Sequence, residues 1–132
     1  MDWQGALRAR LVNNGPVAAL VAQRIYWVDR PQGQPLPAIT LQTISEQREQ
    51  HFAGFDGMDV SRVQIDVWGT SYGEVQAIKE AALAAVIGSN TSNGVHFERA
   101  FVDSIRDLGE RVETQFIHRA SIDLIVHHNT TA

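Results

Sequence analysis

Alternation of apolar and polar positions predicts most of the strands in this chain. The clearest case has an aliphatic residue at every odd position from Val63 to Val67, with polar residues between them. Five segments show such alternation or an enrichment in β-branched and aromatic residues: 24–28, 38–46, 62–68, 95–107 and 116–127. The fourth is the least regular, and a turn around Gly109 is expected after it.

A second period, of three and four residues, predicts one long helix over about 72–87. Its start carries a capping box, because Ser71 can accept a hydrogen bond from the amide of Glu74 and the glutamate can reach back. Gly88 suits the left-handed position that ends many helices. Two shorter helical pieces precede the first strand, one capped by Asp2 and one opened by Pro16.

These elements predict a single domain over residues 1–132 of the α+β class. The sheet is expected to have about five strands and to be mixed but largely antiparallel, because only one long helix is available to cover it. One face of the sheet would then be thinly covered by the short N-terminal helices. A second subunit could cover that face.

Several large apolar side chains are left over once this sheet and helix are packed. Trp68 falls on the polar side of its strand, and Trp27 alternates with Tyr26, so each either packs under the N-terminal helices or meets a partner. The segment 47–59 is long for a loop in so small a domain and is unusually apolar. We therefore expect partner contacts through its apolar residues, Phe52, Phe55 and Met58.

Composition narrows the functional classes. The 132 residues include no cysteine, which excludes disulfides, thiol nucleophiles and thiolate metal sites and fits a reducing cytoplasm. The formal charge is −4, from 11 basic and 15 acidic residues without a basic cluster, so binding to nucleic acid is not expected. No apolar stretch approaches the about 20 residues that cross a bilayer, and no signal peptide is expected.

Catalytic and metal-binding patterns are missing from the sequence. The five histidines lack the spacing of a zinc site, and the adjacent His127 and His128 point to opposite faces of a strand. Asp66 and Asp123 lie on the outward faces of two good strands and could form an acid–base pair. Pairing of each with Arg62, Arg119 or an arginine of another subunit is the favoured interpretation. Neither a nucleophile elbow nor a phosphate-binding glycine loop is present, so we predict no enzyme, metal or cofactor.

The run VQIDVWGTSYGEVQAI at 63–78 resembles the signature of the phage tail-completion or tail-terminator family, found in siphophages, prophages and gene transfer agents. Further features of the chain fit the same pattern. They are the AALV step at 18–21 leading into Arg24, Ile25 and Tyr26, Pro37 before Ile39, and the strand with Arg119, Ser121 and Asp123. The resemblance spans nearly the whole chain but leaves 95–113 without a close match.

This resemblance implies a virion protein that assembles rather than catalyses. Members form a ring, typically a hexamer, which caps the tail tube at its head-proximal end and meets the head–tail connector. DNA only passes through the lumen, and assembly takes place in the host cytoplasm. In such a ring, Trp27, Trp68, Asp66, Asp123 and the 47–59 segment are the expected contact residues. The alternatives are a connector stopper or adaptor protein and, from another class, a small α+β ligand-binding or enzymatic domain.

Overall fold

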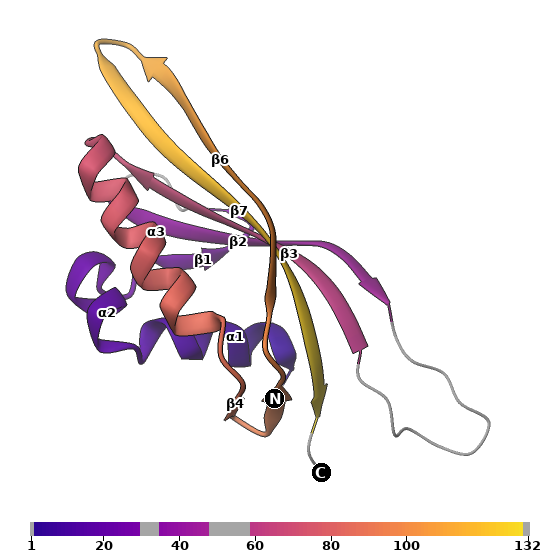
Figure 1. Cartoon of the computed structure of the whole chain (residues 1–132). Helices are drawn as coiled ribbons and strands as arrows, with labels where there is room; N and C mark the ends of the chain where they lie inside the picture. The colour runs from indigo at the N-terminus through magenta and orange to yellow at the C-terminus, as the bar shows by residue number, and fades with distance from the viewer. Residues whose placement is uncertain (1, 30–34, 48–58, 131–132) are drawn as a thin grey trace, which may run out of the picture.

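A computed structural model describes residues 2–29, 35–47 and 59–130, and it has the α+β architecture that the sequence predicts (Figure 1). The helices are α1 (Trp3–Val12), α2 (Gly15–Val21) and α3 (Tyr72–Val86). The strands are β1 (Ile25–Trp27), β2 (Ala38–Gln47), β3 (Asp59–Gly69), β4 (Asn90–Ser92), β5 (Val95–Phe97), β6 (Phe101–Val112) and β7 (Gln115–Thr130).

The seven strands within the described residues form one sheet in the order β1-β2-β3-β7-β5-β4, with β6 also on β7. Only β1 and β2 are parallel, so the sheet is mixed and largely antiparallel, as predicted. The long strand β7 organises the sheet, because β3 pairs along one of its edges while β6 and then β5 share the other. The described residues form seven strands, whereas the sequence predicts about five.

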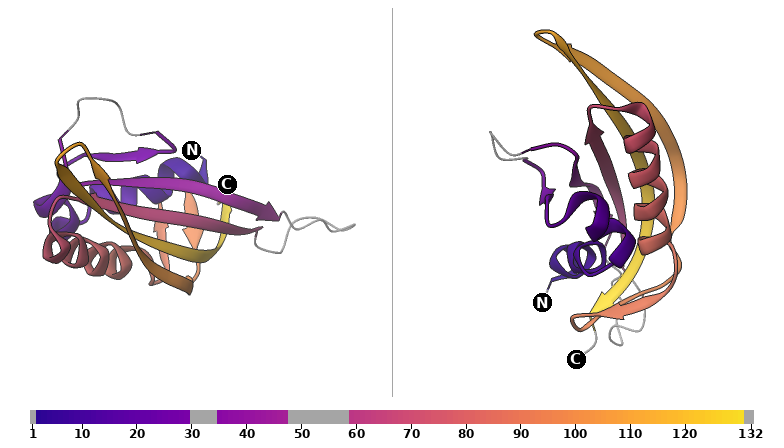
Figure 2. Two further views of the ribbon diagram at one scale, coloured as in Figure 1. Left: turned by 90° about the horizontal axis from the view of Figure 1, so that it is seen from above. Right: turned by 90° about the vertical axis from the view of Figure 1, so that its left-hand side faces the viewer.

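All three helices lie on one face of the sheet, which curls around them (Figures 1 and 2). The aliphatic positions of β2, β3 and β7 face these helices and form a single buried cluster with them. The expectation of a face thinly covered by the N-terminal helices was therefore wrong, because α1 and α2 pack beside α3. The opposite face carries no helix among the described residues.

Hydrogen bonds cap the first turns of α1 and α3, and others join α1 to the end of α3. Ser71 accepts from the amide of Glu74, which is one half of the predicted capping box, whereas the buried Oε1 of Glu74 has no hydrogen-bond partner among the described residues. Asp2 accepts from the amide of Gly5. Arg10 donates to the carbonyls of Ala85 and Gly88 at the C-terminal end of α3, where a cation is favoured by the helix dipole. Burial lowers the pKa of Arg10 from its ordinary value.

The predicted strand 95–107 is wrong in its length and its ending. The chain leaves β5 after Phe97, turns where the buried Ala100 donates to the carbonyl of Ile87, and enters β6 at Phe101. No turn forms at Gly109, since β6 runs straight through it. Glu113 takes the left-handed turn position instead, with φ of 56°.

Candidate interaction surface on the open side of the sheet

Strand β6 is the most exposed regular element of the described chain. It pairs with β7 along one edge, and no described strand pairs along its other edge. Nearly every residue of it is exposed, although five of its side chains are large and apolar. These five are Phe101, Val102, Ile105, Leu108 and Val112. A long apolar edge strand is a site for pairing with another chain unless it is covered.

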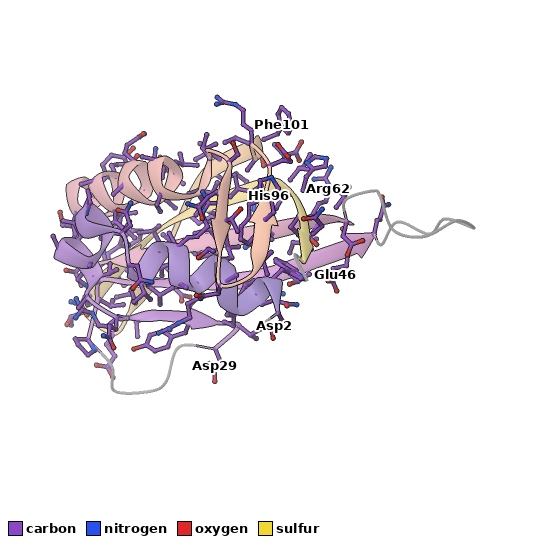
Figure 3. All side chains as sticks on the ribbon, turned by 90° about the horizontal axis from the view of Figure 1, so that it is seen from below. Asp2, Asp29, Glu46, Arg62, His96 and Phe101 are labelled. Atoms are coloured by element: carbon purple, nitrogen blue, oxygen red, sulfur yellow. The ribbon has the colours of Figure 1, made fainter. Side chains whose placement is uncertain are left out.

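The apolar side chains of β6 are distributed over both faces. Its register on β7 puts Phe101, Leu108 and Val112 on the open face of the sheet, and Val102 and Ile105 on the helix side. Figure 3 shows Phe101 at the margin of the molecule, where its ring contacts His127 edge-on at a centroid distance of 6.0 Å. Both faces of this strand are therefore available to a partner.

The β6–β7 hairpin projects beyond the rest of the sheet (Figure 1). Strand β3 ends at Gly69, opposite His118, so the hairpin tip has no neighbouring strand within the described chain. A Cβ atom on Gly109 would lie 2.6 Å from the ring of Phe116, so the glycine makes room for that ring. Arg111 stacks over the same ring at 5.8 Å. The tip thus presents an aromatic ring, 39% exposed, on a two-stranded arm.

Side-chain hydrogen bonds hold the base of this arm to α3. The hydroxyl of Tyr72 and the amide of Gln76 each donate to the carboxylate of Asp107, both at 3.1 Å. The hydrogen bond to Asp107 and the negative charge of that carboxylate raise the pKa of Tyr72. Because α3 packs on the core, these bonds give the arm a defined direction.

Three arginine–aspartate pairs lie on the open face. Arg119 contacts Asp66 at 3.1 Å, Arg106 contacts Asp123 at 2.9 Å, and Arg62 reaches Asp103 at 2.9 Å. Each pair joins residues of different strands, so the pairs tie β3, β7 and β6 together across this face. The basic groups that it presents are accompanied by carboxylates, which leaves little attraction for a polyanion.

Trp68 lines a hollow of about 200 Å³ on the open face, at the base of the hairpin. Its indole nitrogen donates to Thr40, and the guanidinium of Arg119 stacks over its ring at 4.8 Å. The apolar side chains of Leu108 and Ile117 also line the hollow, together with Glu110. A hollow lined by Trp, Arg and aliphatic side chains is the kind of place that takes an apolar anchor of a protein partner.

The sequence-predicted contact residues divide between the two faces. Trp68, Asp66 and Asp123 lie on the open face, whereas Trp27 packs edge-on against Trp3 and donates to the carbonyl of Gln4. Packing under the N-terminal helices was the other position that the sequence allowed for Trp27. Their role in partner contact stays a prediction, and Phe52, Phe55 and Met58 lie outside the described residues.

The carboxylates of Asp66 and Asp123 do not face each other across β3 and β7. Asp66 lies opposite Ser121, and Asp123 lies opposite Gln64. Each is bound to an arginine, which is the favoured pairing from the sequence, although the partner of Asp123 is Arg106. Across the described ranges, no three His, Asp or Glu side chains come together as a metal site, and no helix is long and apolar enough to cross a membrane.

Replacing Asp66 by alanine is expected to lower the free energy of unfolding by about 1–3 kcal/mol. Its nearly buried carboxylate accepts from both Gln64 and Arg119, and those donors would lose their acceptor. Asp103→Ala is the matched control, because Asp103 and Arg62 are both about half exposed and such pairs contribute little. Urea unfolding measures the free energy of both variants. Equal losses would mean that the buried Asp66 pair stabilises the fold no more than the exposed Asp103 pair does.

Two comparisons with known proteins match nearly the whole chain. The model of the family described as "Tail completion protein gp17" matches residues 5–126. A chain in the structure of the virion of a native gene transfer agent particle has the same fold, with a TM-score of 0.69 at 17% sequence identity. That match covers 95% of this chain and 92% of the other.

A chain from Akkermansia muciniphila, solved without its transmembrane region, is 22% identical over 69% of this chain and 46% of its own, with a TM-score of only 0.29. No curated protein matches the chain.

Proposed function

The chain belongs to the tail completion protein family, and we propose that it is a tail terminator that forms a ring on the head-proximal end of a phage-type tail tube. In this role it is a structural subunit without enzymatic activity. One face of the ring ends the growth of the tube, and the other meets the stopper protein of the head connector. The fold that it shares with a chain of a gene transfer agent virion supports a place in an assembled particle.

The exposed apolar edge of β6 is the observation that carries this proposal. A long edge strand with apolar groups on both faces is a liability in a monomeric protein of this size, because its free edge invites uncontrolled pairing. In a ring the same strand is buried between subunits. The hydrogen bonds of Asp107 to α3 keep the strand presented in one orientation, which lowers the ordering cost of assembly.

The electrostatics of the chain suit a passage for DNA. The formal net charge is −4, and the arginines of the open face stand beside aspartates. Affinity for duplex DNA comes mainly from cations that neutralise phosphates, so a lumen built from this chain would let DNA slide without holding it.

Mixing the purified chain with its tail-tube protein tests the terminator role. We expect tubes to acquire a ring at one end and to stop growing there, as seen by electron microscopy of tube lengths with and without the chain. Binding to portal-bearing heads with no effect on the tubes would contradict the proposal and indicate a stopper or adaptor instead.

A further inference from the structure

We propose that the ring is closed by sheet continuation, in which the first part of β6 (residues 101–104) of one copy pairs antiparallel with the free edge of β2 of the next copy. This inference rests on the proposed function, because it names the surface through which the terminator meets itself.

The second free edge lies at the opposite end of the sheet. Strand β1 covers only the first part of β2, pairing from Ile25↔Ile39 to Trp27↔Leu41. From Gln42 to Gln47, β2 has no described strand on that side, although it continues to pair with β3 on the other. Ile44 on this edge is half exposed, so an apolar group is offered here as well.

The directions of the strands make these two edges complementary. Each step from β2 to β3, from β3 to β7 and from β7 to β6 is antiparallel, so β6 runs opposite to β2. A second copy placed beside the first in the same orientation therefore brings its β2 antiparallel to the β6 of its neighbour. The helices of both copies then stay on the same side of the continued sheet.

The residues of the two edges also lie at the same level. Reading across the sheet, Ser45 is level with Arg62, Ile125 and then Phe101. In the same way, Thr43 is level with Val102, by way of Val63 and Leu124. No shift along the strands is needed for the free part of β2 to meet the first part of β6, up to Ser104, which is level with Gln42. The pairing ends there, because Ile105 is level with Leu41, which β1 already covers.

The bulges of both edges fall at this level too, between Thr43 and Ser45 on β2 and between Val102 and Ser104 on β6. The bulged Asp103 is held by Arg62 of its own chain, which keeps that carboxylate on the open face. Glu46 of β2 is likewise occupied, since it accepts from the indole of Trp3 at 2.7 Å. The apolar residues Ile44, Phe101 and Val102 are thus the main exposed side chains where the two edges would meet.

A second copy of this chain is the occupant that these features favour. An edge that fits a different edge of the same molecule repeats head to tail, and such contacts close into rings when the rotation allows it. Pairing of β6 with β6 of another copy would use one edge only and stop at a dimer. The ring needs both edges, and the chain has both.

Disulfide cross-linking tests this pairing cleanly, because the chain contains no cysteine. The double variant Ser45→Cys/Phe101→Cys places one thiol on each edge, and Thr43→Cys/Val102→Cys does so on the other face of the sheet. Within one chain, β3 and β7 lie between the two thiols. The substituted residues are therefore three strand spacings apart, about 14 Å, and a disulfide within a chain cannot form. Each disulfide must therefore join two copies.

We expect at least one double variant, oxidised on assembled tubes, to give a ladder of linked species that ends at the closed ring. Its yield should exceed at least tenfold that of the control Leu20→Cys/Phe101→Cys, which keeps one thiol on β6 and moves the other to α2. Single-cysteine variants should give no species larger than a dimer. Full conversion of Phe101→Cys alone into a dimer would overturn the inference in favour of β6–β6 pairing.

The failure of this inference is distinguishable from the failure of the proposed function. Rings that cap tubes but give no ladder with either double variant would overturn the β6–β2 pairing and leave the terminator role standing. A chain that stays monomeric by solution mass, alone and with the tube protein, would overturn both.

Discussion

The substitution Ile122→Ala is expected to remove about 2–5 kcal/mol from the free energy of unfolding, a large part of the 5–15 kcal/mol typical of such a domain. Ile122 is fully buried in the middle of β7, opposite Ile65 on β3, and belongs to the cluster covered by the helices. Removing its branched chain leaves a void that strands paired on both sides of β7 cannot close. A lower midpoint in guanidinium unfolding, at an unchanged slope, measures the loss.

Ile105→Ala is the matched control for that substitution. Ile105 is the register partner of Ile122 on β6 and faces the same side of the sheet, but 41% of it remains exposed. The isolated chain is therefore expected to lose less than about 1 kcal/mol, since little apolar surface leaves water when it folds. A loss as large as that of Ile122→Ala would mean that β6 is covered within a single chain. That result would contradict the proposal that β6 is an interaction surface.

Elements that satisfy several local rules at once are the ones that could be predicted from the sequence. Strand β3 has strict alternation, and both its aliphatic and its polar faces lie where the pattern places them. Helix α3 combines a cap at Ser71 with an apolar stripe, and its expected span agrees with the observed one to within a residue. In these segments local propensity and tertiary packing favour the same structure.

Strand β6 could be predicted only in part, over residues 101–107, because its side chains follow no period. It has apolar residues on both faces and charges among them, since neither face packs on the core of its own chain. Gly109 misled the prediction, because glycine usually marks a turn, whereas here it accommodates Phe116 on the neighbouring strand. The left-handed residue Glu113 gives no turn signal in the sequence.

One signal in the sequence could have identified another strand pair. Asn93 and Gly94 both have positive φ and join β4 to β5, which is the preferred arrangement of a two-residue hairpin. None of the five predicted strands covers β4, which precedes this turn. The short strands on either side of the turn, each of three residues, offered too little alternation to be recognised.

The double substitution Phe101→Glu/Val102→Glu is expected to reduce ring formation and tube capping by at least about thirtyfold. Two apolar side chains that are buried at an interface contribute on the order of 1–2 kcal/mol or more each, and every 1.4 kcal/mol is a factor of ten. The two residues lie on opposite faces of β6, so the variant charges both sides of the strand. The fraction of capped tubes and the solution mass at fixed concentration measure the effect.

Leu20→Glu separates a specific contact from a general effect of added charge. Leu20 on α2 is 38% exposed, close to the 41% of Val102, but it lies on a helix away from the sheet edge. Because both substituted β6 residues are already largely in water, the double variant should unfold within about 1 kcal/mol of the parent while its assembly fails. If the β6 variant caps tubes as well as Leu20→Glu does, the apolar edge of β6 is not the assembly surface, and its exposure would need another cause.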